Sequence, residues 1–226
     1  MKVISILGSP KGMKGNTGLL LTPMLEAAQN AGAETEIFSL GNLSVLPCNG
    51  CQEVCHITGT CQQKDDFEKI KDAIIEADGI ILASPNYTFN VSAHMKALID
   101  RCALLLHCQR LNGKYGAVVV TSGGSDPEVV ENYLLTVLKN YGLWTLGSIS
   151  AVRAQLDDAD EKTRLMESAT ELGNRMVEAI KNQETFPDQE DERNQAFEIM
   201  KFLVMTLKEE WPFAWDYWNT HWELKE

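Results

Sequence analysis

Four of the six cysteines lie close together in one stretch of the chain, at Cys48, Cys51, Cys55 and Cys61. Two, three and five residues separate them, so the thiolates of one short loop could surround a single metal centre. Iron–sulfur clusters take four cysteine ligands and tolerate short, irregular loops. Structural zinc more often uses two close pairs of ligands with a longer spacer between them. The segment could therefore hold an iron–sulfur cluster or carry redox-reactive thiols without a metal. A zinc site is the third alternative.

The residues around these four cysteines are expected to have ordinary structural roles. His56 follows Cys55 directly and could in principle be a ligand, but we expect it to face solvent on the loop. The three charged residues at 64–66 belong to the start of the next helix and need no ligand role. Cys102 and Cys108 lie in an apolar helical stretch and are predicted to be core or interface residues.

A second candidate site is the loop from Gly8 to Thr17, which follows an apolar run and opens a helical pattern. The start of a helix presents unpaired N–H groups and a partial positive charge to an anion. The hydroxyls of Ser9 and Thr17 and the charges of Lys11 and Lys14 would add to this attraction. Three glycines let the backbone wrap closely around the ligand. The loop is therefore predicted to bind a phosphate.

Two better-known phosphate motifs do not fit this loop. A nucleoside-triphosphate loop needs Gly-Lys followed by Ser or Thr, whereas Gly15 is followed by Asn16. A dinucleotide fingerprint needs Gly-x-Gly-x-x-Gly, which the sequence after Gly8 does not give. Taken alone, the loop could also be a glycine-rich connection that binds nothing.

Two later loops favour a planar ring bound beside the phosphate. The loop Ser84–Asn90 offers the flat faces of Tyr87 and Phe89 and the hydrogen-bonding side chain of Asn86. The loop Thr121–Ser125 carries two glycines that permit a close approach of the backbone. Because all three loops follow strands of one parallel sheet, we expect them at its carboxyl edge, where open sheets bind their ligands.

Apolar patterning predicts the elements that position these loops. Short apolar runs without alternation predict buried parallel strands at 3–7, 34–39, 79–83, 115–121 and 144–152. Helical spacing predicts helices at 17–31, 65–77, 92–108, 126–141 and 157–180, the first with Asn16 as its N-cap. Strands that alternate with helices predict right-handed crossovers, and hence an α/β fold: a three-layer, doubly wound, five-stranded parallel sheet.

These loops resemble those of the NAD(P)H-dependent FMN reductase and iron–sulfur flavoprotein family, whose fold is flavodoxin-like. The likeness is carried by Gly8-Ser9-Pro10-Lys11 with Gly15-Asn16-Thr17, by residues 77–87 and by residues 92–101, within roughly the first 180 residues. It implies FMN as the cofactor. By resemblance, the FMN phosphate would be bound by Ser9, Lys11, Asn16 and Thr17. The isoalloxazine would be contacted by Pro85, Asn86, Tyr87 and Thr88, and bordered by Ser122, Gly123 and Gly124.

The same resemblance bears on the cysteines. Iron–sulfur flavoproteins hold a [4Fe–4S] cluster in a tight cysteine motif between the second strand and the next helix, and this chain matches that position and number. It departs from the motif in having three residues, rather than two, between Cys51 and Cys55. Many relatives keep two or three of these cysteines without a cluster. The resemblance thus implies a [4Fe–4S] cluster on the four cysteines, with loop thiols as the alternative.

The chain divides into two parts by composition. Residues 1–184 are expected to form the FMN-binding domain, with the cysteine-rich insertion at 47–64. Residues 185–226 are expected to form a helical, aromatic-rich extension that holds four of the five tryptophans, at Trp211, Trp215, Trp218 and Trp222. Such aromatic density must pack on something. It could dock on its own domain or clasp a neighbouring subunit.

The overall charge narrows the choice of partners. The formal net charge is −12 and basic residues form no stripe, so nucleic acid is not expected as a partner. No apolar run is long enough to span a bilayer, and no secretory or transit pattern opens the sequence. A cytoplasmic protein without a membrane partner is the resulting expectation.

Together these features predict an FMN-dependent oxidoreductase that passes electrons between a [4Fe–4S] cluster and FMN, without a catalytic acid or base. Electrons could come from ferredoxin or NAD(P)H and go to a quinone or another carrier. Family resemblance implies a homodimer or homotetramer. The alternatives are an NAD(P)H-dependent FMN or quinone reductase without a cluster, and a non-enzymatic electron carrier of the flavodoxin type.

Overall fold

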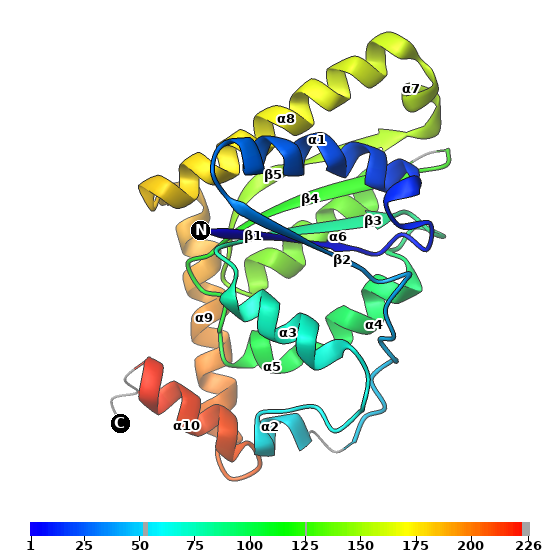
Figure 1. The fold of residues 1–226 in the computed structure, drawn as a ribbon. Coiled ribbons are helices and arrows are strands. Elements are labelled where there is room, and N and C mark those ends of the chain that lie inside the picture. The colour runs from blue at the N-terminus through cyan, green and yellow to red at the C-terminus, as the bar shows by residue number, and fades with distance from the viewer. Residues whose placement is uncertain (52–53, 125, 223–226) are drawn as a thin grey trace.

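A computed structural model describes residues 1–51, 54–124 and 126–222 (Figure 1). The insertion at 47–64 and the extension at 185–226 are therefore each described in part. Five strands are present: β1 (Lys2–Leu7), β2 (Glu34–Ser39), β3 (Gly79–Pro85), β4 (Tyr115–Ser122) and β5 (Trp144–Val152). The helices are η1 (Gly12–Lys14), α1 (Asn16–Asn30), α2 (Val54–Thr58), α3 (Phe67–Glu76), α4 (Ala93–Arg101), α5 (Ala103–His107), α6 (Pro127–Asn140), α7 (Arg153–Asp157), α8 (Ala159–Asn182), α9 (Pro187–Thr206) and α10 (Pro212–His221).

The strands form one parallel sheet in the order β2-β1-β3-β4-β5, which is the flavodoxin-like order. Helices α1 and α8 cover one face, and α3, α4, α5 and α6 cover the other (Figure 1). Alternate residues of β1 enter the two resulting cores: Ile4 and Ile6 pack toward α3 and α4, whereas Val3 and Leu7 pack toward α1 and α8. The predicted fold class is confirmed.

Helices α1 and α8 approach each other closely because α8 carries a glycine at their contact. A Cβ atom on Gly173 would overlap the carbonyl oxygen of Met24 in α1 and lie 3.1 Å from the Cβ of Ala27. Backbone atoms cannot move aside as a flexible side chain can. Gly173 therefore sets the distance between the two helices of this layer.

We expect Gly173→Ala to lower the free energy of unfolding by about 1–3 kcal/mol, the usual cost of overpacking. Gly124→Ala is the matched control, because a Cβ at that position has no atom within 4 Å. Urea denaturation of both variants measures the difference. An equal stability of the two variants would contradict the proposed role of Gly173.

Two predicted helices differ from the structure, and the extension adds a helix that begins at a proline. The N-cap of α1 is Gly15, so the prediction of Asn16 as the cap is wrong, and Asn16 is the first helical residue. The predicted helix at 92–108 is interrupted at Cys102, whose N–H is shared between the carbonyls of Leu98 and Ile99. Pro187 begins α9, as suits a residue without an N–H in the first turn.

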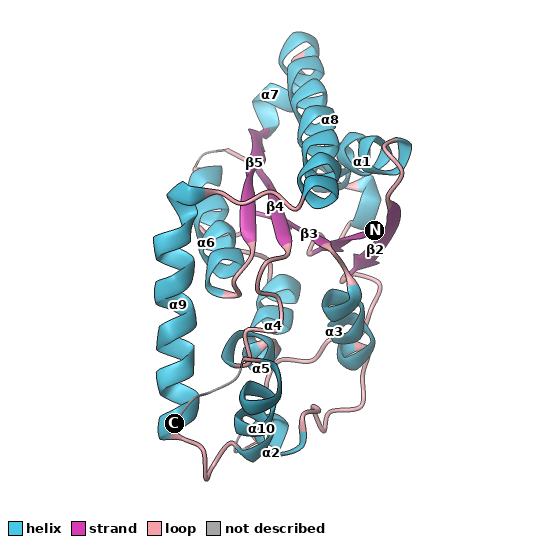
Figure 2. Cartoon of the chain, turned by 90° about the vertical axis from the view of Figure 1, so that its left-hand side faces the viewer, coloured by secondary structure: helices cyan, strands magenta, loops and turns pink. Residues whose placement is uncertain are grey.

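The C-terminal extension packs on its own chain. Helix α9 runs beside α5 and α6, and α10 lies against α2 (Figures 1 and 2). Trp218 is fully buried and its Nε1 donates a hydrogen bond of 2.7 Å to the carbonyl of His107. Trp222 Nε1 donates similarly to the carbonyl of Cys108, at 3.1 Å. The buried core between the extension and α5 consists of Leu104, Cys108, Val204, Trp211, Ala214 and Trp218.

The prediction that Cys102 and Cys108 are packed inside is confirmed, since their exposed fractions are 4% and 0%. Within the three described ranges, no helix is long and apolar enough to cross a membrane.

Candidate functional site

A pocket of about 310 Å³ lies at the carboxyl edge of the sheet, beside the point where the strand order reverses between β1 and β3. Ligands of open parallel sheets bind at this position. The pocket brings together the three loops that follow β1, β3 and β4, and the start of α7. Its lining consists of Ser9, Lys11, Lys14, Gly15, Asn16, Pro85, Asn86, Tyr87, Thr121, Ser122, Gly123, Arg153 and Asp157.

One end of the pocket suits an anion. Helix α1 begins there at Asn16, and no side chain caps its first turn. In the turn that precedes α1, the N–H of Gly12 donates a hydrogen bond of 2.9 Å to the carbonyl of Ser9. Gly12 has a positive φ of 55°. Lys11 and Lys14 supply positive charge at the same end. An uncapped helix start with two nearby cations has the features to which a phosphate binds.

Thr17 is buried beside the pocket and contacts the end of β4. It is 2% exposed, and its Oγ1 lies 2.7 Å from Oγ1 of Thr121 at the end of β4. This hydroxyl pair joins the first turn of α1 to the sheet. Thr17 thus joins the start of α1 to the end of β4, and it is not among the residues that line the pocket.

The loop after β3 presents aromatic rings at the other end of the pocket. Tyr87 and Asn90 exchange backbone hydrogen bonds of 2.8 and 3.2 Å around Thr88 and Phe89, which have φ of 53° and 61°. Positive φ at a β-branched residue and at an aromatic one is uncommon and costs energy. The turn leaves Tyr87 and Phe89 49% and 61% exposed. Strained backbone that exposes two rings beside a pocket is typical of a ligand site.

Most of the predicted flavin residues line this one pocket, and three lie beside it. Thr17, Thr88 and Gly124 are outside the lining, although each adjoins a residue that belongs to it. Sequence reasoning gave no role to Arg153 and Asp157, which form an ion pair of 3.2 Å at the pocket. They directly follow the fifth strand, and that position at the carboxyl edge could have indicated them.

The cysteine segment lies elsewhere, beside α2, and none of its described residues lines this pocket. Cys48 is exposed, whereas Cys51, Cys55 and Cys61 are half-buried. Burial, and then the neighbouring thiols of Cys51, Cys61 and Cys48, raise the pKa of Cys55 to about 11. Among residues 1–51, 54–124 and 126–222, however, no three His, Cys, Asp or Glu side chains are arranged to hold a metal ion.

A buried arginine anchors the end of the cysteine segment. Arg101 of α4 forms an ion pair with Asp65, and the two side chains are each 1% exposed. The same guanidinium donates to the carbonyl of Leu46 at 3.2 Å and to Sγ of Cys61 at 3.2 Å. Its carbon also lies 4.2 Å from the centre of the Phe67 ring. Arg101 therefore joins both ends of the 47–64 insertion to the core, a role that the sequence did not indicate.

His56 is buried, so the expectation of a solvent-facing histidine is wrong. It is 3% exposed, and its Nδ1 lies 3.5 Å from Sγ of Cys55. Its Nε2 lies 2.6 Å from Nδ1 of His107. Burial, and then the neighbouring His56, lower the pKa of His107 to about 4, so His107 is uncharged at neutral pH. The indole of Trp211 stacks on both imidazoles, which removes them from water.

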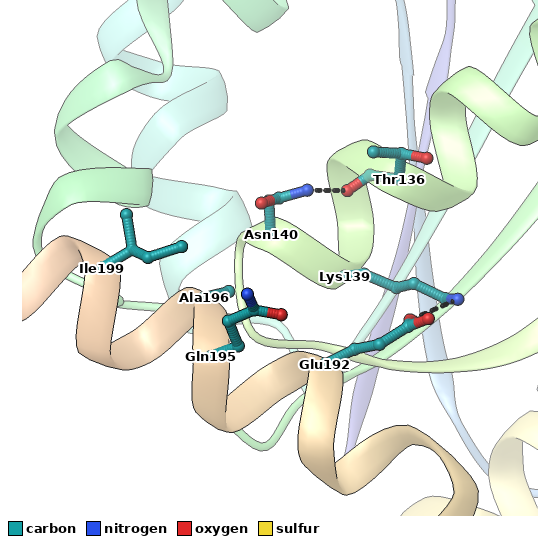
Figure 3. Close-up of a pocket in the computed structure, with 7 residues that line it drawn as sticks. All are labelled: Thr136, Lys139, Asn140, Glu192, Gln195, Ala196 and Ile199. Atoms are coloured by element: carbon teal, nitrogen blue, oxygen red, sulfur yellow. Dashed lines mark hydrogen bonds and ion pairs between the residues drawn. The ribbon is translucent and has the colours of Figure 1, made fainter.

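A second hollow of about 300 Å³ lies between α6 and α9 (Figure 3). Lys139 and Glu192 form an ion pair of 2.7 Å across it. This hollow lies at the carboxyl end of α6, which leads into the start of β5. It is therefore at the opposite edge of the sheet from the pocket at the carboxyl ends of the strands. Its lining offers neither a helix N-terminus nor a cysteine.

Comparison with known sequences shows the family of the chain. The sequence profile of the NADPH-dependent FMN reductase family matches residues 1–157. An iron–sulfur flavoprotein of Archaeoglobus fulgidus is 35% identical over 213 residues, which cover 92% of this chain and 91% of that protein. An iron–sulfur flavoprotein of Methanocaldococcus jannaschii is 36% identical over 192 residues, which cover 80% of this chain and 98% of that protein.

Solved structures show the same fold at low sequence identity. The chain is similar to RosB with a bound intermediate, 8-demethyl-8-formylriboflavin-5′-phosphate, with a TM-score of 0.66 and 12% identity. That match covers 88% of this chain and 87% of RosB. At this identity the likeness speaks for the fold alone.

Proposed function

Because the chain belongs to the NADPH-dependent FMN reductase family, and within it resembles the iron–sulfur flavoproteins over almost its whole length, we propose that it passes electrons between a [4Fe–4S] cluster and FMN. Its membership makes it an FMN-binding, flavin-dependent oxidoreductase of flavodoxin-like fold. The residues of the cluster, the placement of the flavin and the transfer between the two belong to the proposal.

The carboxyl-edge pocket fits FMN. We propose that the phosphate is held at the uncapped start of α1 by Ser9, Lys11, Asn16 and the neighbouring Thr17, with Lys14 as a further cation. The ring would lie along Pro85, Asn86, Tyr87 and Thr88, bordered by Ser122, Gly123 and Gly124. A Cβ on Gly123 would meet no atom within 4 Å, so this side of the pocket has room for a ring.

The phosphate assignment predicts a selective loss of affinity. We expect Lys11→Met to raise the Kd for FMN about tenfold or more, because a hydrogen bond to a charged group contributes about 1.5–3 kcal/mol. Riboflavin has the same ring and no phosphate, so its Kd should not change. Quenching of flavin fluorescence measures both constants. Equal losses for FMN and riboflavin would place Lys11 at the ring instead.

The observation that carries the cluster proposal is the set of four cysteines at 48–61, in a chain 35% identical to an iron–sulfur flavoprotein over 213 residues. Four cysteines in one short segment are the ligand set that a [4Fe–4S] cluster needs. Cys61 also accepts a hydrogen bond from Arg101, and hydrogen bonds to cluster sulfurs are one means by which proteins tune these centres. When bound, a cluster would supply single-electron transfer and FMN would link it to two-electron chemistry.

The direct test is iron and acid-labile sulfide analysis, with the visible absorbance, after anaerobic purification and reconstitution. We expect about four iron and four sulfide per chain for a [4Fe–4S] cluster. Protein that stays free of iron after reconstitution would overturn the proposal.

A reductase without a cluster is the second candidate, and one observation favours it. The described thiols are not arranged as a metal site, and Cys48 is exposed. Such an enzyme would reduce its flavin rapidly with NADPH or NADH and would keep its turnover in a Cys48→Ala, Cys51→Ala double variant. Turnover of this double variant relative to wild type separates the two candidates.

Partners follow from the same proposal. We propose a reduced ferredoxin or NAD(P)H as the electron donor and a quinone or a second carrier as the acceptor. A homodimer or homotetramer is also proposed, since α9 leaves Ile199, Phe202 and Met205 on its surface with exposed fractions of 52%, 73% and 41%.

A further inference from the structure

The C-terminal extension touches the cysteine segment at two points. The indole of Trp211 stacks on His56 at 4.2 Å and on His107 at 4.6 Å between ring centres. Two residues further on, the ring of Phe213 lies directly on Gly59, where a Cβ atom would overlap it. Helix α10 therefore covers α2, which lies between Cys51 and Cys61 (Figure 1).

Helix α2 needs such a cover. It has five described residues, and a helix this short is unstable without tertiary contacts. His56 is its buried residue, and this side chain reaches Sγ of Cys55 on one side and His107 of α5 on the other. The position of Cys55 thus depends on how His56 is held.

Trp211 packs directly on His56. It is 5% exposed, and it spans the two imidazoles, so that His56 and His107 share one apolar surface. His107 is itself fixed, since its carbonyl accepts a hydrogen bond from the buried Trp218. Tryptophans at 211 and 218 therefore fix both members of the histidine pair.

We propose that Trp211 is a positioning residue for the cysteine segment: through His56 it holds Cys55 in place and keeps it away from solvent. All residues of this contact belong to one chain. An effect of Trp211 on a bound cluster rests on the function proposed above. The effect on Cys55 itself is expected in the metal-free protein as well.

The test is the rate of thiol alkylation in the full-length, reduced, metal-free protein, followed for each cysteine by mass spectrometry. We expect Trp211→Ala to raise the rate at Cys55 about tenfold, as loss of two aromatic stacking contacts increases local opening. Cys48 is exposed already and serves as the internal reference, with an unchanged rate. Trp211→Phe keeps a stacking ring and should restore most of the protection.

Trp215→Ala is the matched control, because this indole also belongs to α10 but stacks on Lys208 rather than on a histidine. It should leave the Cys55 rate within about twofold of wild type, as expected for a change that spares the stack. An unchanged rate in Trp211→Ala would overturn the proposal. An equal rise in Trp215→Ala would overturn it too, because the effect would then be a general loosening of α10.

A second readout separates this inference from the cluster proposal. In reconstituted protein, Trp211→Ala should lose its visible absorbance to an iron chelator about tenfold faster than wild type, by the same increase in opening. If wild type takes up no iron while Trp211→Ala still exposes Cys55 to alkylation, the cluster proposal fails and the positioning role stands. If wild type takes up iron but alkylation is unchanged in Trp211→Ala, the positioning role fails alone.

Discussion

Arg101→Met is expected to lower the free energy of unfolding by about 3–5 kcal/mol, the cost of leaving one charge of a buried ion pair without its partner. Arg101 and Asp65 are both 1% exposed at the side chain. Removal of the guanidinium would leave the Asp65 carboxylate buried with only the backbone N–H groups of Leu46 and Phe67 to stabilise it, at 2.8 and 3.1 Å. Urea denaturation of the metal-free protein measures the change.

Lys96→Met provides the comparison on the same helix. Lys96 pairs with Asp100, but both side chains are 45% exposed, so the loss should be within about 1 kcal/mol. The double variant Arg101→Met, Asp65→Asn should recover part of the stability, because it removes the unpaired charge. A loss in Arg101→Met no larger than in Lys96→Met would show that the buried pair contributes nothing.

The pH dependence of this loss has a definite sign. Burial alone would raise the pKa of Asp65, but hydrogen bonds from Arg101, Leu46 and Phe67 hold it below its usual value. The contribution of the carboxylate is therefore present above the unfolded-state pKa of about 3.9 and is lost as the pH falls through the folded-state value. In Arg101→Met the carboxyl can take up a proton to remove its charge. The difference in the free energy of unfolding between wild type and Arg101→Met should thus be largest near neutral pH and should become smaller below about pH 4.

The sheet and the pocket could be predicted because both depend on local patterns. A parallel strand covered on both faces is a continuous apolar run, and β1, β3 and β4 are such runs in the sequence. The loops after them come to one edge by topology alone. The residues of Gly8–Thr17 were therefore found without any knowledge of side-chain contacts.

The surroundings of the cysteines could not be predicted, because their contacts join residues far apart in the chain. Arg101 looked like one polar position in an apolar helix, yet it reaches Asp65 and Cys61. His56 looked like a loop residue, and it is buried only because Trp211 covers it from the C-terminal extension. The extension was expected to pack on something, but its aromatic content did not indicate where.

Cys55→Ser is expected to abolish cluster assembly, with iron after reconstitution falling from about four per chain to near zero. The reason is that Cys55 is one of the four proposed ligands, and a serine hydroxyl cannot replace a thiolate ligand. FMN affinity should stay within about twofold of wild type, since the phosphate and ring contacts of the flavin pocket do not include the segment. Iron analysis and flavin titration on one preparation measure both.

Cys102→Ala is the matched control for this loss. Cys102 is 4% exposed and packs in the core near α4, so its removal should cost some stability and leave the iron content unchanged. Equal iron in Cys55→Ser and wild type would place the iron on other residues and contradict the four-cysteine site. The three-residue spacing between Cys51 and Cys55 makes this test informative, because it is the one point at which the segment departs from the tight motif. Loss of iron in Cys55→Ser but not in Cys102→Ala would mean that the longer spacing still brings these thiols to one centre.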